Sequence, residues 1–191
     1  MNAPLNAESS RPLEGGPSFP LRHRLFRALW TVTWFLLASW TPAFLNSWRV
    51  AILRLFGAKI ACGAVVHGSA RIWYPPNLYM APLASLGPGV VCYCMDRIEI
   101  GQRAVVSQRS HLCAGSHDID DPNFQLIVAP ITIGSSAWIA SEAFVGPGVY
   151  VGEGAVLGAR GVTAKNLNAW TVYVGNPARA IRPRSGESKH P

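Results

Sequence analysis

The sequence predicts an all-β solenoid, a triangular parallel β-helix with an N-terminal helical extension. Three observations predict it: aliphatic residues recur every six positions, small residues follow most of them four places later, and glycines and prolines are spread along the chain. A period of six fits neither an α-helix nor an ordinary strand, whose side chains repeat every 3.6 and every two residues. It fits a coil of three short strands, in which aliphatic side chains fill the prism and successive coils pair in parallel.

Composition predicts one folded unit and argues against some partners. The chain has 191 residues, 49% of them hydrophobic and only 14% charged, which is enough for one core with modest appendages. The net charge of +7 comes from basic residues that gather towards the two ends, a distribution that argues against nucleic acid as a partner. The four cysteines form no CxxC pair, so we expect free thiols, no metal site and a reducing, cytoplasmic location.

The N-terminal third divides into two segments. Residues 1–20 are rich in Pro, Gly, Ser and Ala without an apolar period, so we expect a flexible lead-in that can be deleted without loss of function. Residues 21–57 predict helices that break at Pro42, with an uncharged, Trp-rich stretch over 28–48. This extension fits a cap on the open solenoid, an anchor lying in a membrane surface, or a transmembrane span, against which the proline and several polar residues weigh.

The second helix of this extension has recognisable end signals. Ser47 is expected to cap its N-terminus, and Gly57 to end it, because glycine tolerates the left-handed turn found there. Arg49 and Arg54 fall off the face that carries Trp48 and the other apolar residues, so we expect both arginines to be exposed.

The repeat itself occupies residues 58–184, followed by a tail, 185–191. Its aliphatic positions are Ile60, Val66, Ile72, Leu78, Ile100, Val106, Leu112, Ile133, Ile139, Val145, Val151 and Leu157. The small or β-branched residues expected beside them in the interior are Ala64, Ala70, Ala104, Ser110, Ser116, Ala137, Ala143, Val149, Ala155 and Gly161. The period breaks between Leu112 and Ile133, which predicts an extruded loop over 117–132, and slips again between Leu78 and Ile100.

Five stretches of this repeat region carry a family resemblance: RLFGAKI, ARIWYPPNL, SQRSHLCAGSHD, the block PITIGSSAWIASEAFVGPGVYVGEGAVLGARGVTAKN, and VGNPARAIRPR. Over residues 47–184 the chain resembles the hexapeptide-repeat acetyltransferases, in particular those of colanic acid biosynthesis and the maltose and galactoside O-acetyltransferases. The resemblance implies a left-handed β-helix and a homotrimer with active sites between subunits. It also implies transfer of acetyl from acetyl-CoA to a sugar hydroxyl, in exopolysaccharide biosynthesis, without a metal.

The resemblance assigns catalytic roles to two residues. His117 stands at the exit into the extruded loop, where the family has its general base, and a neutral imidazole can take a proton from a sugar hydroxyl and pass it to the leaving thiolate. Ser141 lies where the family uses a backbone N–H to hold the thioester oxygen.

The resemblance also implies contacts to the CoA and to the acceptor. Ala159 and Ala164 would line the pantetheine groove through their backbones, while Lys165, Arg179 and Arg182 would meet the phosphates. Candidates for binding the acceptor, or for orienting the base, are Asp118 and Asp121 in the loop, whereas Asp120 fits ordinary turn chemistry. Galactoside-type relatives place an acceptor-binding asparagine before the histidine, and its absence over 89–96 leaves Asp96 as a candidate and the sugar open.

Other functions fit parts of the sequence. The acceptor could be an antibiotic or serine in place of a sugar, or the β-helix could be a scaffold without catalysis. A γ-class carbonic anhydrase uses the same fold and binds zinc with three histidines, for which His67, His111 and His117 are available. His111 and His117 are six residues apart, however, and so belong to adjacent faces of the prism.

Overall fold

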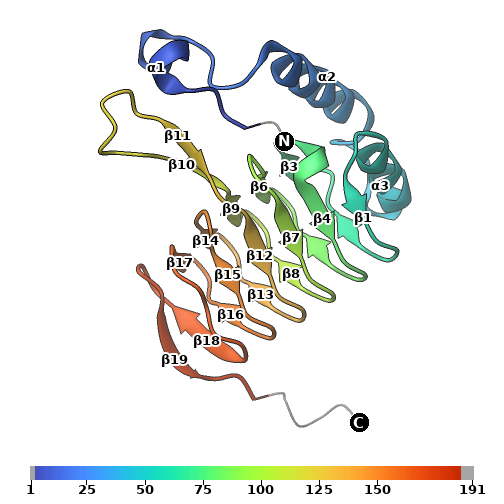
Figure 1. Cartoon of the computed structure of the whole chain (residues 1–191). Helices are drawn as coiled ribbons and strands as arrows, with labels where there is room; N and C mark the ends of the chain where they lie inside the picture. The colour runs from blue at the N-terminus through green and yellow to red at the C-terminus, as the bar shows by residue number, and fades with distance from the viewer. Residues whose placement is uncertain (1–2, 186–191) are drawn as a thin grey trace.

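Residues 3–185 are described by the computed structural model, and they form a parallel β-helix of about six turns with helices at its N-terminal end (Figure 1). The first face of the prism holds β1 (Lys59–Ile60), β4 (Leu78–Met80), β7 (Ile98–Ile100), β12 (Ile131–Ile133) and β15 (Tyr150–Val151). The second face holds β2 (Val65–Val66), β5 (Ser85–Leu86), β8 (Val105–Val106), β13 (Trp138–Ile139), β16 (Val156–Leu157), β18 (Thr171–Val174) and β19 (Arg179–Pro183). The third face holds β3 (Arg71–Ile72), β6 (Val91–Tyr93), β9 (His111–Cys113), β14 (Phe144–Val145) and β17 (Val162–Thr163). The predicted solenoid is confirmed, and its architecture is consistent with the left-handed form that the resemblance implies.

The interior of the prism is filled as the repeat predicts. Ile133, Ile139 and Val145 are at most 1% exposed, and they pair with Val151, Leu157 and Thr163 of the next coil. The small residues are buried beside them, with one exception. Ser116 is exposed, because it lies in β10 (Gly115–His117) outside the prism, so its assignment to the interior is wrong.

The first coils are longer than the repeat predicts. Ile60 pairs with Met80 and Met80 with Ile100, which makes twenty residues a coil, whereas Ile133 pairs with Val151 after eighteen. The equivalent of Ile60 is therefore Met80, and the assignment of Leu78 to that position is wrong. The extra residues follow β3 and β6, and in the first coil they include the 3-10 turn η3 (Pro75–Asn77).

The helical extension packs on the N-terminal end of the prism (Figure 1). Helix α2 (Leu21–Leu37) buries Trp30 and Trp34 against β3, where their indole N–H groups donate to the carbonyl oxygens of Ile72 (2.7 Å) and Ala70 (3.2 Å). A 3-10 turn, η2 (Ala43–Leu45), then leads into α3 (Asn46–Leu55), which packs on β1 and β2. Within residues 3–185, no helix has the length and apolarity that a membrane crossing requires.

Two expectations for α3 are wrong. The helix begins at Asn46 and Ser47 makes no capping bond, whereas the Asn46 side chain donates to the Ala64 carbonyl and accepts from the Val66 N–H. Arg49 is 1% exposed, because its guanidinium donates to the carbonyl oxygens of residues 41, 42, 43 and 66. Val66 lies on β2, the terminal strand of its sheet, so no preceding coil offers a backbone N–H to its carbonyl.

The lead-in contains short regular elements. It forms α1 (Ala7–Ser10) and a 3-10 turn, η1 (Pro12–Glu14), and it buries Phe19 against the aromatic rings that follow β3. Gln125 of the extruded loop receives a hydrogen bond from the Ala7 N–H (2.7 Å) and donates one to the Leu5 carbonyl (3.1 Å). The lead-in thus bridges the helical extension and the loop. Of the expected tail, only Ser185 lies within the described residues.

Candidate active site

The extruded loop is an antiparallel hairpin that leaves the third face after β9. Its strands are β10 and β11 (Leu126–Val128), and His117 pairs with Leu126 at the point where the hairpin opens. In Figure 1 the hairpin projects from the coils beneath α1. The expected loop is thus present, and His117 stands at its base and not inside the prism.

His117 has a defined tautomer. Its Nδ1–H donates to the carbonyl oxygen of Phe124 (2.8 Å), and its ring stacks on the Phe124 ring at 4.2 Å between centroids. Because a carbonyl oxygen can only accept, Nδ1 must carry the proton, which leaves the lone pair on Nε2. Phe124 has φ of 53°, an uncommon conformation for an aromatic residue, so the turn that supplies this carbonyl is strained. The imidazole is therefore oriented to accept a proton at Nε2.

A cleft of about 390 Å³ opens beside His117, which we call the His117 cleft. Its walls come from three parts of the chain: Tyr93 and Met95 after β6, Trp73 after β3, and Arg24 and Arg27 on α2. The lead-in closes it with residues 15–19. Aromatic faces and guanidinium groups around a basic imidazole form a surface that can hold a polar, ring-shaped molecule with a hydroxyl near Nε2.

Burial shapes the electrostatics of this cleft. The guanidinium of Arg27 lies 4.2 Å from the centroid of the Trp73 ring, and burial together with the charge of Arg24 lowers its pKa. Burial raises the pKa of Tyr93, which therefore stays a neutral hydroxyl. Behind the cleft, His23 stacks on Phe19, and burial followed by the charge of Arg27 lowers its pKa to about 4. The cleft is thus cationic through its arginines alone.

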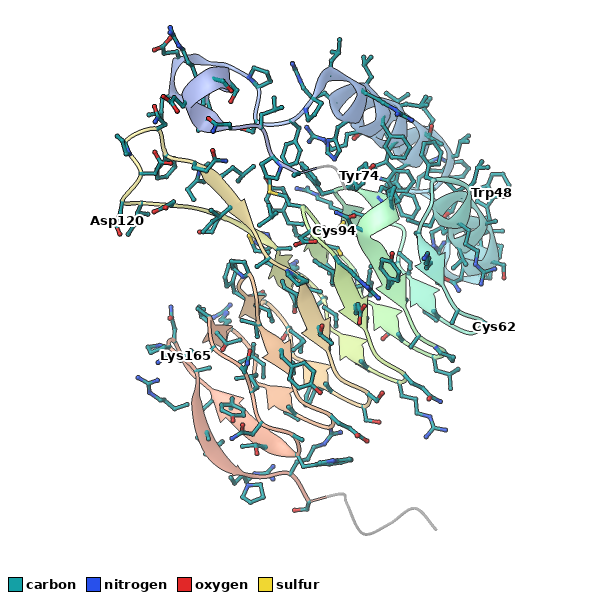
Figure 2. All side chains as sticks on the ribbon, viewed as in Figure 1. Trp48, Cys62, Tyr74, Cys94, Asp120 and Lys165 are labelled. Atoms are coloured by element: carbon teal, nitrogen blue, oxygen red, sulfur yellow. The ribbon has the colours of Figure 1, made fainter. Side chains whose placement is uncertain are left out.

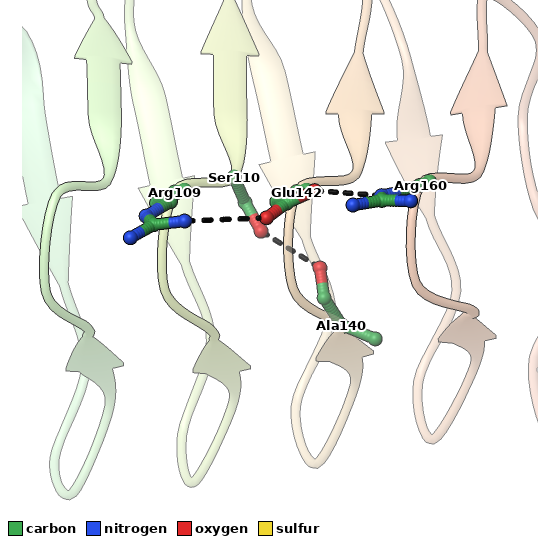
Figure 3. Close-up of polar contacts among 5 residues, drawn as sticks. All are labelled: Arg109, Ser110, Ala140, Glu142 and Arg160. Carbon is green, nitrogen blue, oxygen red and sulfur yellow. Dashed lines mark hydrogen bonds and ion pairs between the residues drawn. The ribbon is translucent and has the colours of Figure 1, made fainter.

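The corner that carries Ser141 lies between the second and third faces. The Ser141 carbonyl accepts from the Arg160 N–H of the next coil (2.9 Å), whereas its own N–H donates to no group among residues 3–185. Glu142 forms a ladder along this corner with Arg109 (3.5 Å) and Arg160 (2.7 Å), shown in Figure 3. The hydrogen bond and charge of Arg160 lower the pKa of Glu142. The corner thus presents a free amide beside an ordered charge ladder.

The expected CoA contacts lie along the late coils. Ala159 occupies the corner position one coil after Ser141, and Ala164 and Lys165 follow β17 at the next corner. Arg179 and Arg182 are exposed on β19, and none of the three basic residues has a carboxylate within 4 Å in the described part of the chain. Figure 2 shows Lys165 on the outer edge of these coils. Unpaired basic side chains and free corner amides fit a ligand that carries phosphates.

The acidic candidates are held by their own turns. The Asp118 carboxylate accepts from the Asp120 N–H (3.1 Å), and that of Asp121 from the Asn123 N–H (2.7 Å). Asp96 accepts from the N–H of Arg97, and it lies outside the residues that line the His117 cleft. Figure 2 places Asp120 at the outer tip of the hairpin. The group that orients His117 is therefore the Phe124 carbonyl, which accepts from its ring, and not one of these carboxylates.

The structure separates some of the candidates and adds others. His117 lies on the hairpin that follows the third face, whereas Ser141 lies at the corner between the second and third faces. No hydrogen bond joins the two residues within the described chain. The sequence analysis missed Arg24, Arg27 and the aromatic residues of the cleft. The WY pair of ARIWYPPNL was a signal for an aromatic surface, but no repeat connects residues 24–27 with residue 117.

The three histidines of the zinc alternative are dispersed. His67 bonds to Ser69 after β2, and His111 lies on the third face with burial lowering its pKa. Within residues 3–185, no three His, Cys, Asp or Glu side chains are grouped so that they could hold a metal ion.

Comparisons with known proteins agree with this architecture. No protein-family model matches the chain. It is 43% identical over 156 residues to WcaF from Escherichia coli (strain K12), which is named as an acetyltransferase of colanic acid biosynthesis. The match covers 82% of this chain and 86% of that protein, and a WcaF from Shigella flexneri matches equally.

Solved structures share the fold at lower identity. A maltose O-acetyltransferase from Clostridium difficile 630 has a TM-score of 0.78 and 23% identity, over 87% of this chain and 90% of that one. A galactoside acetyltransferase in complex with coenzyme A has a TM-score of 0.71 and 21% identity, over 90% of this chain and 86% of that one. An acetyltransferase from Vibrio cholerae, complexed with acetyl coenzyme A, has a TM-score of 0.72 and 19% identity over 87% and 91%.

The β-helix with its extruded hairpin, together with the sequence identity to WcaF, defines a hexapeptide-repeat acetyltransferase. Within this class, the 43% identity to WcaF over most of both chains identifies the family. The chain belongs to the family of the colanic acid biosynthesis acetyltransferases.

Proposed function

We propose that the protein transfers acetyl from acetyl-CoA to a hydroxyl of a saccharide during exopolysaccharide biosynthesis, with His117 as the general base. The observation that carries the proposal is the Nδ1–H bond to Phe124, since it leaves a basic Nε2 facing a cleft with aromatic and cationic walls. The WcaF name supports the pathway, and the coenzyme A complexes of the structural neighbours support the donor.

The chemistry follows from these groups. Nε2 of His117 takes the proton of the acceptor hydroxyl as its oxygen bonds to the thioester carbonyl carbon. The Ser141 N–H donates to the carbonyl oxygen while it carries negative charge. The carbon–sulfur bond then breaks, the proton passes from Nε2 to the sulfur, and an acetyl ester and CoA leave. Lys165, Arg179 and Arg182 hold the CoA phosphates, and the backbones of Ala159 and Ala164 border its pantetheine arm.

The site is completed between two subunits of a homotrimer. His117 and Ser141 stand at different corners of one chain, so one subunit cannot offer both groups to the same thioester through the contacts described above. In a closed three-fold arrangement, the corner of one prism from which the His117 hairpin leaves lies beside the Ser141 corner of the neighbouring prism.

The corner turns allow a sharp test of this arrangement. Pro82, Pro88 and Pro147 occupy the same turn position as Ser141, each before a residue with positive φ, as Ser141 precedes Glu142 (φ 60°). Ser141→Pro therefore removes the N–H while it keeps the turn. Alone it should lower kcat by about 10² to 10³, the usual loss of one oxyanion donor, whereas Gln102→Pro at another corner should not.

Complementation then tests the shared site. Ser141→Pro and His117→Ala chains, unfolded and refolded together, should form mixed trimers in which about a quarter of the sites receive both intact groups. CoA release should recover to about that fraction of the wild-type rate, and size-exclusion chromatography with light scattering should report a trimer. No recovery from verified mixed trimers would place both groups in one subunit and contradict the proposal.

We further propose that α2 rests on the cytoplasmic surface of a membrane. Its outer face exposes a stripe of large apolar side chains, Leu21, Leu25, Leu29, Val32, Phe35 and Leu36, and the turn after it exposes Trp40 and Phe44. Residues 15–95 contain seven Arg and Lys and no Asp or Glu, so this end of the molecule complements anionic headgroups.

Vesicle sedimentation tests the membrane proposal. The wild type should bind vesicles that contain anionic lipid at low salt and release from them at high salt. Replacing Leu29 and Phe35 by serine should abolish the binding, while Ile181→Ser, at an exposed apolar residue on the opposite end of the prism, should not change it. Equal binding by the two variants would contradict the role of α2.

A further inference from the structure

A second cavity, of about 470 Å³, lies between α2 and the third face of the prism, and we call it the α2 groove. Trp30, Trp34 and Phe35 form its helical wall, and Ile72 and Val91 the opposite wall. The indole N–H groups of both tryptophans are already bonded to backbone carbonyls, so the surface they offer is hydrocarbon. A groove of this kind suits a chain of methylene or isoprenoid carbon.

The α2 groove and the His117 cleft adjoin each other. Arg27, Trp73 and Tyr93 line both of them, and we call these three residues the junction. At the other end, Phe35 lines the groove and is also 69% exposed on the apolar stripe of α2. The groove therefore extends from the apolar outer surface of α2 to side chains that also border the His117 cleft.

Positive charge at the junction has no counterpart in the chain. Arg27 and Arg71 line the groove from opposite walls, and neither has a carboxylate within 4 Å in residues 3–185. The Nε atom of Arg27 is buried and makes no hydrogen bond within that range. Arg24 adds a third guanidinium close by, which increases the repulsion. A partly buried guanidinium without a carboxylate partner favours the binding of an anion.

From these observations we infer a binding site for a lipid phosphate: a hydrocarbon chain lies in the α2 groove and the phosphate lies between Arg27 and Arg71. The proposal rests on the proposed function for its consequence, since a saccharide attached to that phosphate extends into the His117 cleft. A free sugar phosphate satisfies the arginines but leaves the groove unfilled. A membrane surface beside α2 is the source of such an amphiphile.

Binding measurements with simple probes test the site without any acetyl transfer. Decyl phosphate, used below its micellar concentration, carries both chain and charge, inorganic phosphate carries only the charge, and decanol only the chain. Isothermal titration with the full-length protein should show decyl phosphate binding once per chain, at least tenfold more tightly than either of the other probes.

Three variants separate the parts of the site. Thr31 lines the groove on the exposed side of α2, so Thr31→Trp should fill it and weaken decyl phosphate and decanol at least tenfold. Arg71→Gln should weaken decyl phosphate about tenfold and leave decanol unchanged. Arg103→Gln, which removes the same charge at a corner outside both cavities, should change neither.

Two results would overturn the inference. One is decyl phosphate binding no better than inorganic phosphate, and the other is binding at many sites per chain that Thr31→Trp leaves unaltered, as expected of a detergent. These outcomes are independent of the proposed function, which fails if acetyl-CoA and every saccharide acceptor give no CoA release. Where both stand, a sugar 1-phosphate carrying a decyl ester should exceed the unesterified sugar 1-phosphate in kcat/KM at least tenfold, and Thr31→Trp should remove that advantage.

Discussion

The coils over 131–163 and the first coils over 59–113 share one prism but differ in what they carry. The later coils have eighteen residues each, with one strand and one tight corner per hexad. The first coils have twenty, and the extra residues after β3 and β6 present Trp73, Tyr93 and Met95 to α2 and to the hairpin. The regular half provides the corner amides, and the irregular half provides the walls of the cleft. Departures from the repeat therefore coincide with the walls of the His117 cleft, where we propose that the acceptor binds.

The largest effect should come from breaking the regular half. Ile139 is fully buried in β13, so Ile139→Asp places an unpaired charge inside the prism and should prevent folding, since its cost is comparable to the whole stability of about 5–15 kcal/mol. Ile181→Asp, at a residue 56% exposed on β19, should fold normally. Circular dichroism and soluble yield compare the two, and a folded Ile139→Asp protein would contradict the packing described here.

The next largest effect should be a loss of catalytic rate with no loss of stability. His117 lies outside the prism, so His117→Ala should leave the unfolding temperature and CoA affinity nearly unchanged while kcat falls by about 10² to 10⁴, the usual loss of a general base. His67→Ala, at a histidine outside the cleft, should retain full activity. Acceptor-dependent CoA release measures both, and more than about a tenth of wild-type kcat in His117→Ala would rule out its role as base.

A smaller effect should come from the lead-in. Deleting residues 1–18 removes the wall of the His117 cleft over 15–18, so KM for the acceptor should rise about tenfold, or about 1.4 kcal/mol, with CoA affinity unchanged. Gln125→Ala removes the bonds to Ala7 and Leu5, together with one to the Leu126 carbonyl, and should change KM in the same direction by less. An unaltered KM for the acceptor in the deletion variant would support the prediction from composition that the lead-in can be removed without loss of function.

The smallest effect should be a pH dependence of stability. His23 is buried and neutral, with its pKa lowered to about 4 from an ordinary value of 6.5. Within residues 3–185, Arg27 is the one charged group that acts on the pKa of His23, and the rings of Phe19, Trp73 and Tyr74 lie beside it. The unfolded chain therefore binds the proton more readily, so this contribution is complete above pH 6.5 and is lost as the pH falls towards 4.

His23→Phe tests that contribution. It keeps the aromatic stack and removes the titration, so the unfolding temperature of the wild type should fall by roughly 5 °C more than that of the variant between pH 7 and pH 4.5. Parallel curves would show that another group controls this range.

The sequence allowed the prism to be predicted because each hexad is a local signal. A strand is predicted by each aliphatic residue of the repeat alone, such as Ile133, Ile139 or Val145. The longer interval that follows Leu112 predicts the hairpin. The cleft could not be predicted in this way, since it depends on contacts between residues far apart, such as Arg27 with Trp73. Arg49 shows the same limit: helical spacing assigned it to solvent, but its guanidinium binds the Val66 carbonyl at the end of the prism and the Pro42 carbonyl of the turn before α3.

The bond between Ala7 and Gln125 also has a consequence for the order of events during synthesis. The two residues are separated by 118 positions, so the segment that contains Ala7 is made before three coils and the hairpin and must wait for them. Such long-range closures come late in folding. The protein is therefore a stable solenoid before it is an enzyme with a finished acceptor site, and nascent or truncated chains that end before the hairpin cannot assemble the cleft.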